Sequence, residues 1–294
     1  MHIFYTKTYN LSGANAEKQQ ITETVARKLG YQELSFFRFD DSTDTDTELH
    51  MRMEAITAPL QAGSVVLFQY PSMVSLRYDH FALEHIRRNP DTKIILYVQD
   101  LGSVIAPETY GSLADEINFF NQGDFLILPS PTMQAELSAQ GLRKIPFLCQ
   151  EIWEYPYEVQ RSSVRITACE SNISGNISLD SFYQLTTSGI AAVMNADSRY
   201  ERQSNPLAAG FCLCSGIPVF APAGSRLHDF IMKYDLGFPV DNETTVEDVL
   251  AKLTEDEIAA VIQRIQKLQP LINTGFFTEH LLETAVFQAV TQKL

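Results

Sequence analysis

The chain has 294 residues, of which 45% are hydrophobic, so it is long enough for one or two domains with substantial cores. Its formal net charge of −14, without a Lys/Arg cluster, excludes the basic surface that nucleic acid or an anionic membrane requires. No stretch approaches the roughly 20 apolar residues of a membrane span, and the N-terminus has no apolar run typical of a signal peptide.

The first half of the sequence alternates short apolar runs with amphipathic segments. Continuous Val/Ile/Leu runs predict parallel strands that are buried on both faces. Gly30, Gly63 and Gly141 stand where helices are expected to end. The pattern predicts a parallel sheet that is covered by helices on both faces. In chain order, the predicted strands are 2–6, 34–39, 64–70, 93–99, 124–130 and 145–149, and the predicted helices are 15–29, a segment ending near 63, 78–88, 109–121 and 131–140.

The segment 152–162 breaks this alternation, because it contains the only Trp and a Pro and has no clear period. We place a domain boundary there. A second alternating region follows, and the last fifty residues are predicted to be helical, with Thr254 and Glu257 forming a capping box. The predicted elements of the second region are strands at 164–170, 189–197 and 237–240, a helix near 180–187, and a helix, strand, turn and helix within 204–240.

In open parallel sheets, ligands bind beyond the carboxyl ends of the strands. This rule selects candidate segments without any knowledge of a family. They are 6–13, 69–72, 99–100 and 129–130 in the first domain, and 195–205 and 222–225 in the second.

Four cysteines, Cys149, Cys169, Cys212 and Cys214, lie in apolar surroundings, and the histidines are scattered. Cys212 and Cys214 are two residues apart, which is poor spacing for zinc. We expect free buried thiols, no metal site and a cytoplasmic protein.

Several motifs occur in a characteristic order: "FQYPS", "YVQDL", "LPSPTM", "QEIWEYP", "RQSNPLAAGFCLCSGIPVFA", "LHDFIMKYDLGFPVDN" and "INTGFFTEHLLETAV". Together they resemble the GT-B glucosyltransferases that extend glycans on serine-rich repeat adhesins, earlier labelled nucleotide-sugar synthetase-like proteins. The resemblance covers nearly the whole chain. No single motif in this set is decisive, but the ordered set is fairly specific.

This resemblance implies an α/β protein of the GT-B fold, with two Rossmann-like domains whose parallel sheets face a central cleft. It implies a UDP-sugar donor, most simply UDP-glucose, on the second domain and a glycoprotein or glycan acceptor on the first. It implies no cofactor or metal, a homo-oligomer, and a last helix that packs on the first domain. The domains we predict are 1–157, 158–275 and the C-terminal helix 276–294.

The chain departs from the family pattern at the expected donor site. The family has "NPHK" where this chain has "SNPLA", so the lysine that meets the donor diphosphate is Ala208 here. Only about ten residues, 170–180, fill a gap in which relatives carry a further strand and helix. The second domain is therefore expected to have lost one such unit.

Asn205 and Pro206 are expected to start a helix, as cap and first-turn residue. Its free N–H groups suit a diphosphate, although an ordinary capped helix is the alternative. Arg199 and Arg202 lie upstream and are candidates to replace the missing charge, or are solvated surface residues. Tyr183 suits uracil stacking or a core position, and Ser12–Gly13 suits a donor-facing loop or a simple turn. The predicted donor-binding residues are Ser12, Gly13, Tyr183, Arg199, Arg202, Ser204, Asn205 and Leu207.

Asp100 is the candidate general base, because inverting transfer needs a carboxylate to deprotonate the acceptor hydroxyl. A helix cap or loop hydrogen bond is the alternative role for this aspartate. Relatives often carry His-Asp here, and this chain has Gln99-Asp100. The predicted acceptor-side residues are Gln69, Tyr70, Gln99 and Trp153, with packing of the hinge as the alternative for Trp153.

Two functions remain open at this point. The first is a hexosyltransferase that uses a UDP-sugar and a glycoprotein or related glycan. The second is a non-catalytic relative that binds a glycan or serves as the partner subunit of an active transferase. The lost lysine, histidine and strand–helix unit favour the second function, and the retained framework favours the first. An epimerase or dehydrogenase is disfavoured, because no G-x-G-x-x-G follows the first strand.

Overall fold

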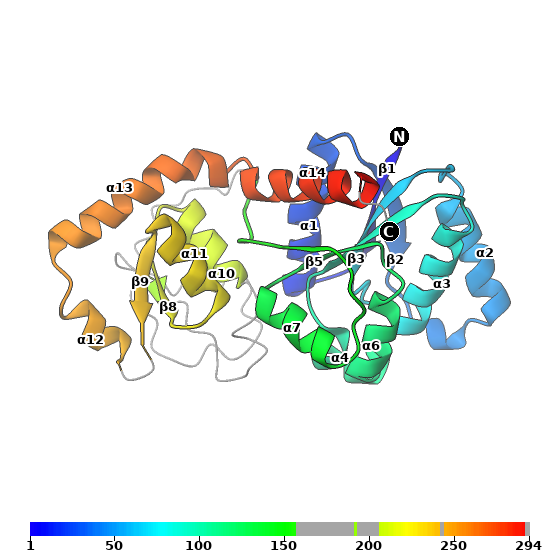
Figure 1. The fold of residues 1–294 in the computed structure, drawn as a ribbon, viewed down its shortest axis with the longest axis horizontal. Helices are drawn as coiled ribbons and strands as arrows, with labels where there is room; N and C mark the ends of the chain where they lie inside the picture. Colours follow the sequence, from blue (N-terminus) through cyan, green and yellow to red (C-terminus); the bar gives the residue numbers. More distant parts are fainter. Residues whose placement is uncertain (157–190, 193–205, 242–243, 292–294) are drawn as a thin grey trace. The chain divides into compact units, whose positions relative to one another are not determined.

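The computed structural model describes residues 1–156, 191–192, 206–241 and 244–291. The chain divides into two compact units, the first made of Met1–Cys149 and Glu279–Leu294 and the second of Gln150–Thr278 (Figure 1). Each unit contains a parallel sheet. The predicted boundary between residues 157 and 158 lies outside the described residues and stays a prediction.

The first unit is built on a six-stranded sheet in the order β2-β1-β3-β4-β5-β6. All five pairings are parallel, so the carboxyl ends of the strands share one edge. Every residue of β3 and β5 is buried, as the continuous apolar runs predict. The strands are β1 (Ile3–Tyr9), β2 (Gln32–Phe37), β3 (Val65–Tyr70), β4 (Lys93–Val98), β5 (Phe125–Leu128) and β6 (Phe147–Cys149).

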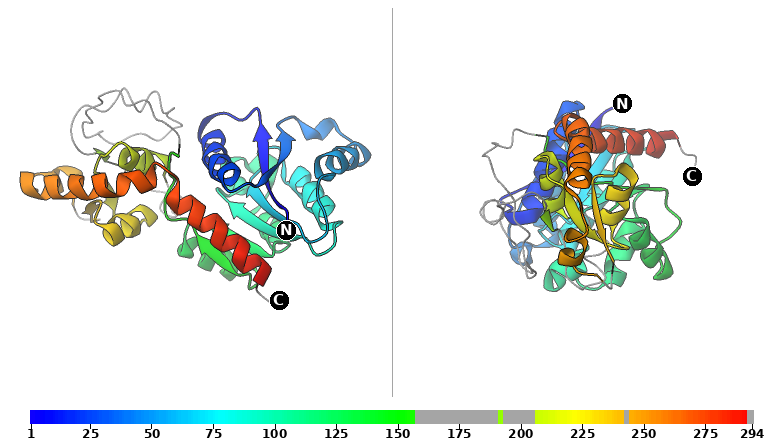
Figure 2. Two further views of the ribbon diagram at one scale, coloured as in Figure 1. Left: turned by 90° about the horizontal axis from the view of Figure 1, so that it is seen from above. Right: turned by 90° about the vertical axis from the view of Figure 1, so that its left-hand side faces the viewer.

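The strand order divides the helices between the two faces of this sheet. The chain runs from β1 to β2 in one direction along the sheet and from β2 to β6 in the other. Right-handed connections therefore leave α1, which joins β1 to β2, on one face and the helices that join the strands from β2 to β6 on the opposite face. The C-terminal α14 lies beside α1 (Figure 2). Lys28 of α1 pairs with Glu279 of α14 at 2.5 Å. The helices are α1 (Gly13–Lys28), α2 (Asp46–Thr57), α3 (Leu76–Arg87), α4 (Gly102–Ile105), α5 (Pro107–Tyr110), α6 (Leu113–Phe120), α7 (Pro131–Ala139) and α14 (Phe276–Thr291).

The prediction of one helix over 109–121 is wrong. Gly111 adopts a φ of +70°, which ends α5 and favours glycine. Ser112 then caps α6, because its hydroxyl accepts from the Asp115 N–H while the Asp115 carboxylate accepts from the Ser112 N–H. The Ser-x-x-Asp pattern in the sequence is thus a helix start that the periodicity concealed.

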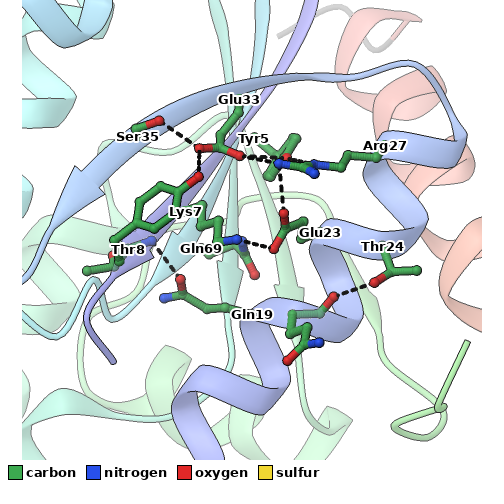
Figure 3. A network of polar contacts seen from close by, with 12 residues as sticks. Tyr5, Lys7, Thr8, Gln19, Glu23, Thr24, Arg27, Glu33, Ser35 and Gln69 are labelled. Carbon is green, nitrogen blue, oxygen red and sulfur yellow. Dashed lines mark hydrogen bonds and ion pairs between the residues drawn. The ribbon is translucent and has the colours of Figure 1, made fainter. Parts of the chain in front are cut away.

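Polar side chains tie α1 to the edge of this sheet (Figure 3). Glu33 of β2 accepts hydrogen bonds from the Tyr9 hydroxyl at 2.7 Å, from Ser35 Oγ at 2.6 Å and from Arg27 Nη2 at 2.9 Å. The Tyr5 hydroxyl donates to the same carboxylate at 3.1 Å. One carboxylate therefore links β1, β2 and the last turn of α1.

The second unit has a smaller parallel sheet in the order β7-β8-β9. The predicted strand 237–240 is confirmed, and so is the capping box of Thr254 and Glu257 at the start of α13. The predicted strand 164–170 and helix 180–187 lie outside the described residues. The elements are β7 (Ala191–Ala192), β8 (Val219–Pro222), β9 (Gly237–Val240), α10 (Leu207–Cys214), α11 (Arg226–Tyr234), α12 (Val246–Leu250) and α13 (Glu255–Ile272).

Three cysteines fall within the described part of the chain, and all three are free thiols. Cys212 and Cys214 are buried in α10, while Cys149 is half-buried. Burial raises the pKa of Cys214 to about 12, so this thiol stays protonated at neutral pH. None of the described helices combines the length and hydrophobicity that spanning a bilayer requires.

We predict that Glu33→Gln removes a stabilisation that depends on pH. Partial burial acts to raise the pKa of Glu33, but hydrogen bonds from Ser35, Tyr9, Arg27 and Tyr5 outweigh it and lower the pKa from 4.5 to about 2. This contribution to stability is complete above pH 4.5 and is lost as the pH falls towards 2. Urea unfolding should show the free-energy gap between wild type and variant narrowing from neutral to acid pH.

Glu108→Gln, at an exposed position in α5, is the control for that measurement. A gap between wild type and Glu33→Gln that stays constant over the acid range would contradict the role given to the Glu33 carboxylate.

Candidate functional site

A chain of buried polar side chains links the middle of β1 to the carboxyl ends of β3 and β4. Gln99 Nε2 donates to Gln69 Oε1 at 2.8 Å, and Gln69 Nε2 donates to the Thr6 carbonyl at 2.5 Å. The Gln69 N–H also donates to Thr6 Oγ1 at 2.8 Å. All three residues are buried, so these hydrogen bonds fix the three strands relative to one another.

A buried ion pair lies beside this chain. Lys18 Nζ of α1 is 2.6 Å from Asp100 Oδ2, directly after β4, and 3.5 Å from the Gln99 carbonyl. Lys18 and Asp100 are each 7% exposed. The structure thus places the predicted base, Asp100, at the carboxyl edge with an ammonium group held against it.

The prediction missed Lys18. The signal was present, since Lys18 precedes Ile21 by three residues and Val25 by seven, which places it on the buried face of the helix. A lysine on such a face needs a partner, but the partner is 82 residues away in the sequence.

The backbone of the segment after Asp100 is fixed by hydrogen bonds to the Glu116 carboxylate of α6. This buried carboxylate accepts from the Gly102 N–H at 2.6 Å and from the Ser103 N–H at 3.0 Å. The Tyr70 hydroxyl donates to it at 2.7 Å. Burial raises the pKa of Tyr70 well above its ordinary value, so the phenol is neutral. Asp100 therefore stands between two backbone segments that are both fixed by side chains.

Three of the predicted acceptor-side residues, Gln69, Tyr70 and Gln99, are buried and support the strand ends in this structure. The fourth, Trp153, is also buried, and its carbonyl would lie 1.8 Å from a Cβ added at Gly210. Contact of these four residues with an acceptor stays a prediction.

The turn before α1 has the features expected of an open helix start. Gly13 has a φ of +67°, and Ser12 occupies the N-cap position without a side-chain hydrogen bond to the helix. No acidic residue lies in the first turn of α1. Farther along the helix, the Thr8 N–H donates to Gln19 Oε1 at 2.8 Å, which holds α1 against the end of β1.

In the second unit, α10 begins at Leu207 with Pro206 as its N-cap. The prediction that Asn205 caps the helix and Pro206 lies in its first turn is wrong by one residue, because Pro206 has extended backbone with a ψ of 130°. The first turn of α10 has neither a side-chain cap nor an acidic residue. The other predicted donor residues, Tyr183, Arg199, Arg202, Ser204 and Asn205, lie outside the described residues.

The other long helices of the described part of the chain start differently. α2, α3, α6, α7, α11 and α13 each have a Ser or Thr side chain that accepts from a first-turn N–H. At the start of α14, the buried Glu154 accepts from the N–H groups of Phe277 and Thr278 at 3.1 and 2.6 Å. Among the described helices of eight residues or more, only α1 and α10 begin without such an acceptor from the described part of the chain. A start of this kind leaves N–H groups for an anionic ligand.

Residues 150–156 hold α10 in place. The Tyr155 ring packs edge-on against Phe211 at 5.7 Å, and the Tyr155 hydroxyl donates to the Leu207 carbonyl at 3.4 Å. The Trp153 carbonyl occupies the space beside Gly210. The position of the open helix start thus depends on the sequence "WEYP". Within the described residues, no cluster of three or more His, Cys, Asp or Glu is arranged to hold a metal.

Family models for the glucosyltransferase 3-like proteins match both parts of the chain. The N-terminal domain model matches residues 1–152, and the C-terminal domain model matches residues 175–285. The chain belongs to the glucosyltransferase 3-like family. This result confirms the resemblance to GT-B glucosyltransferases that the ordered motifs indicate.

Two curated members of this family align along their full lengths. Glucosyltransferase 3 of Streptococcus gordonii is 25% identical, with 99% of this chain and 100% of the relative covered. Glucosyltransferase 3 of Streptococcus parasanguinis is 24% identical, with 99% of each chain covered. Both alignments extend over 336 positions, more than the 294 residues of this chain, so the relatives contain segments that this chain lacks.

Solved structures show the same fold at low sequence identity. Anabaena HepE in complex with UDP has a TM-score of 0.56 and 10% identity, with 98% of this chain and 100% of that chain covered. HepE in complex with UDP-glucose has a TM-score of 0.55 and 11% identity over the same shares. The predicted α/β fold of the GT-B glycosyltransferases is therefore confirmed.

We predict that Gly210→Ala destabilises the protein, although alanine favours helices over glycine by about 1 kcal/mol. The added Cβ would lie 1.8 Å from the Trp153 carbonyl oxygen, so the backbone of one segment must move. Overpacking of this kind costs about 1–3 kcal/mol, which chemical unfolding detects. The two effects have opposite signs and leave a net loss of about 0–2 kcal/mol. A variant more stable than wild type, as helix propensity alone predicts, would contradict the described packing of residues 150–156 on α10.

Proposed function

We propose that the protein is a metal-independent glycosyltransferase that moves a hexose, most simply glucose, from a UDP-sugar to a hydroxyl of a glycoprotein or related glycan. Membership of a glycosyltransferase family supports the reaction class. HepE, which shares the fold, binds UDP and UDP-glucose, and this supports the class of donor. The observation on this chain that carries the proposal is the open N-terminus of α10.

In the proposed reaction, α10 binds the donor diphosphate. The N–H groups of its first turn and the positive end of its dipole suit the charge that develops on the departing UDP. Leu207 is the first residue of this turn, and Ala208 follows where the family lysine is expected. We assign Arg199 and Arg202 the compensating positive charge, in keeping with the prediction from the sequence.

The acceptor binds to the first unit, where Asp100 lies at the carboxyl edge of the sheet. The acceptor oxygen attacks the anomeric carbon, the bond from that carbon to the β-phosphate oxygen breaks, and the acceptor proton moves to the Asp100 carboxylate. The products are the glycosylated acceptor and UDP. Ser12 and Gly13 form the second open helix start and complete the donor side.

UDP release in the presence of acceptor tests this function. Purified protein should release UDP from a UDP-hexose only when a suitable glycopeptide or sugar is present. Asp100→Asn should lower kcat by about 10²–10⁴-fold, the contribution typical of a general base. The exposed Asp256 of α13 provides the matched control as Asp256→Asn, which should leave the rate unchanged.

The non-catalytic alternative is favoured by one specific observation, the lack of any basic side chain in the first turn of α10. If no UDP-hexose yields UDP with any acceptor, and the chain instead co-purifies with an active transferase, the alternative replaces the proposal.

We predict that Ala208→Lys tightens UDP binding about tenfold, since an ammonium beside a diphosphate adds a charge-assisted contact of about 1.4 kcal/mol. Ala208→Met extends the side chain without the charge and should leave affinity unchanged. Isothermal titration with UDP measures both effects. Equal affinities of the two variants would contradict the placement of the diphosphate at α10.

A further inference from the structure

The ion pair between Lys18 and Asp100 is costly as a purely structural contact. Both groups are 7% exposed, so each has lost most of its hydration. Apolar side chains of similar volume fill such a position with equal or greater stability. Because stability gains little from such a contact, we look for its role in the geometry of the Asp100 carboxylate.

The backbone on both sides of Asp100 is held by contacts that do not depend on Lys18. The Gln99 N–H, before it, donates to the Tyr70 carbonyl at 2.8 Å, and the Gly102 N–H, after it, donates to Glu116 at 2.6 Å. Neither of these contacts involves the Asp100 carboxylate. The Lys18 ammonium contacts that carboxylate at 2.6 Å and therefore selects where it points.

Lys18 is itself held by its helix. Its neighbour Gln19 accepts from the Thr8 N–H at 2.8 Å, and Thr22 Oγ1, one turn later, donates to the Lys18 carbonyl at 3.0 Å. At the end of the same helix, Arg27 pairs with Glu33 at 2.9 Å. The ammonium thus reaches Asp100 from a helix that is anchored at several points to β1 and β2.

We infer that Lys18 is the positioning residue of the proposed transferase, which holds the Asp100 carboxylate directed for proton transfer from the acceptor. The inference rests on the proposed function, because it assigns Lys18 a role only through Asp100. A misplacement of about 1 Å in a reacting group costs about 10²-fold in rate, so this contact is expected to act on kcat.

The test is a double-substitution cycle with Lys18→Met and Asp100→Asn, assayed by UDP release with saturating acceptor. Lys18→Met should lower kcat by about 10–10²-fold while the KM for the UDP-sugar stays within about twofold of wild type. Lys18→Arg, which keeps the charge, should recover much of the rate. In the Asp100→Asn background, Lys18→Met should have no further effect on kcat, because the group on which it acts is gone.

Lys28→Met is the matched control, since Lys28 lies on the same helix and also forms an ion pair, but at an exposed position. It should leave kcat unchanged in both backgrounds. Urea unfolding of every variant shows whether it is folded. Lys18→Met removes a charged partner from a buried carboxylate and should be less stable than wild type, and Asp100→Asn added to it should restore stability.

The outcomes separate the two ideas. No UDP release by the wild type would overturn the proposed function, and the role of Lys18 with it. A second result would overturn the role of Lys18 alone. The wild type releases UDP, but in the folded double variant the two substitutions lower kcat by the product of their separate effects. Lys18 would then act independently of Asp100.

Discussion

The fixed position of α1 on the first sheet is the constraint on which the candidate acceptor side depends. Near the C-terminal end of α1, Arg27 forms an ion pair with Glu33. In its first half, Gln19 accepts a hydrogen bond from the Thr8 N–H, and the neighbouring Lys18 forms an ion pair with Asp100. These contacts join residues from β1, β2 and the end of β4. A rotation of the helix about its axis by a fraction of a turn would break these contacts. The position of the Asp100 carboxylate therefore depends on how α1 packs against the sheet.

In the second unit, different contacts fix the position of α10. α10 is held by the Tyr155 ring on Phe211, by the close approach of the Trp153 carbonyl to Gly210, and by the Tyr155 hydroxyl, which donates to the Leu207 carbonyl. In both units the helix is positioned along its side and not by a capping side chain at its start. This leaves first-turn N–H groups for an anion, whereas the capped helices have already used theirs.

The architecture of the first unit was predictable from sequence, because buried parallel strands give continuous apolar runs and helices end at glycines such as Gly30 and Gly141. The exact helix boundaries were harder to predict from the sequence. The break at Gly111 was hidden, since the residues on both sides of it keep a helical pattern. The start of α10 was misplaced by one residue, because Asn205 and Pro206 both suit a helix start.

The candidate site was predictable only in part, and the reason is distance along the chain. Asp100 was found because it directly follows a buried strand. Its partner Lys18 was not, because nothing near residue 18 encodes a contact with residue 100. The hydrogen bond from the buried Tyr70 hydroxyl to Glu116 likewise depends on packing between β3 and α6, which no local sequence pattern predicts.

The central claim is that this chain keeps a working donor site although its family lysine is Ala208. Thermal stabilisation of the purified protein by UDP and UDP-glucose measures this most directly. We expect a clear increase in Tm that saturates with UDP concentration, because a ligand at a hundred times its Kd adds about 2.7 kcal/mol to the stability. Replacing Arg199 and Arg202 should abolish this increase. No change in Tm with UDP or any UDP-sugar would contradict the claim.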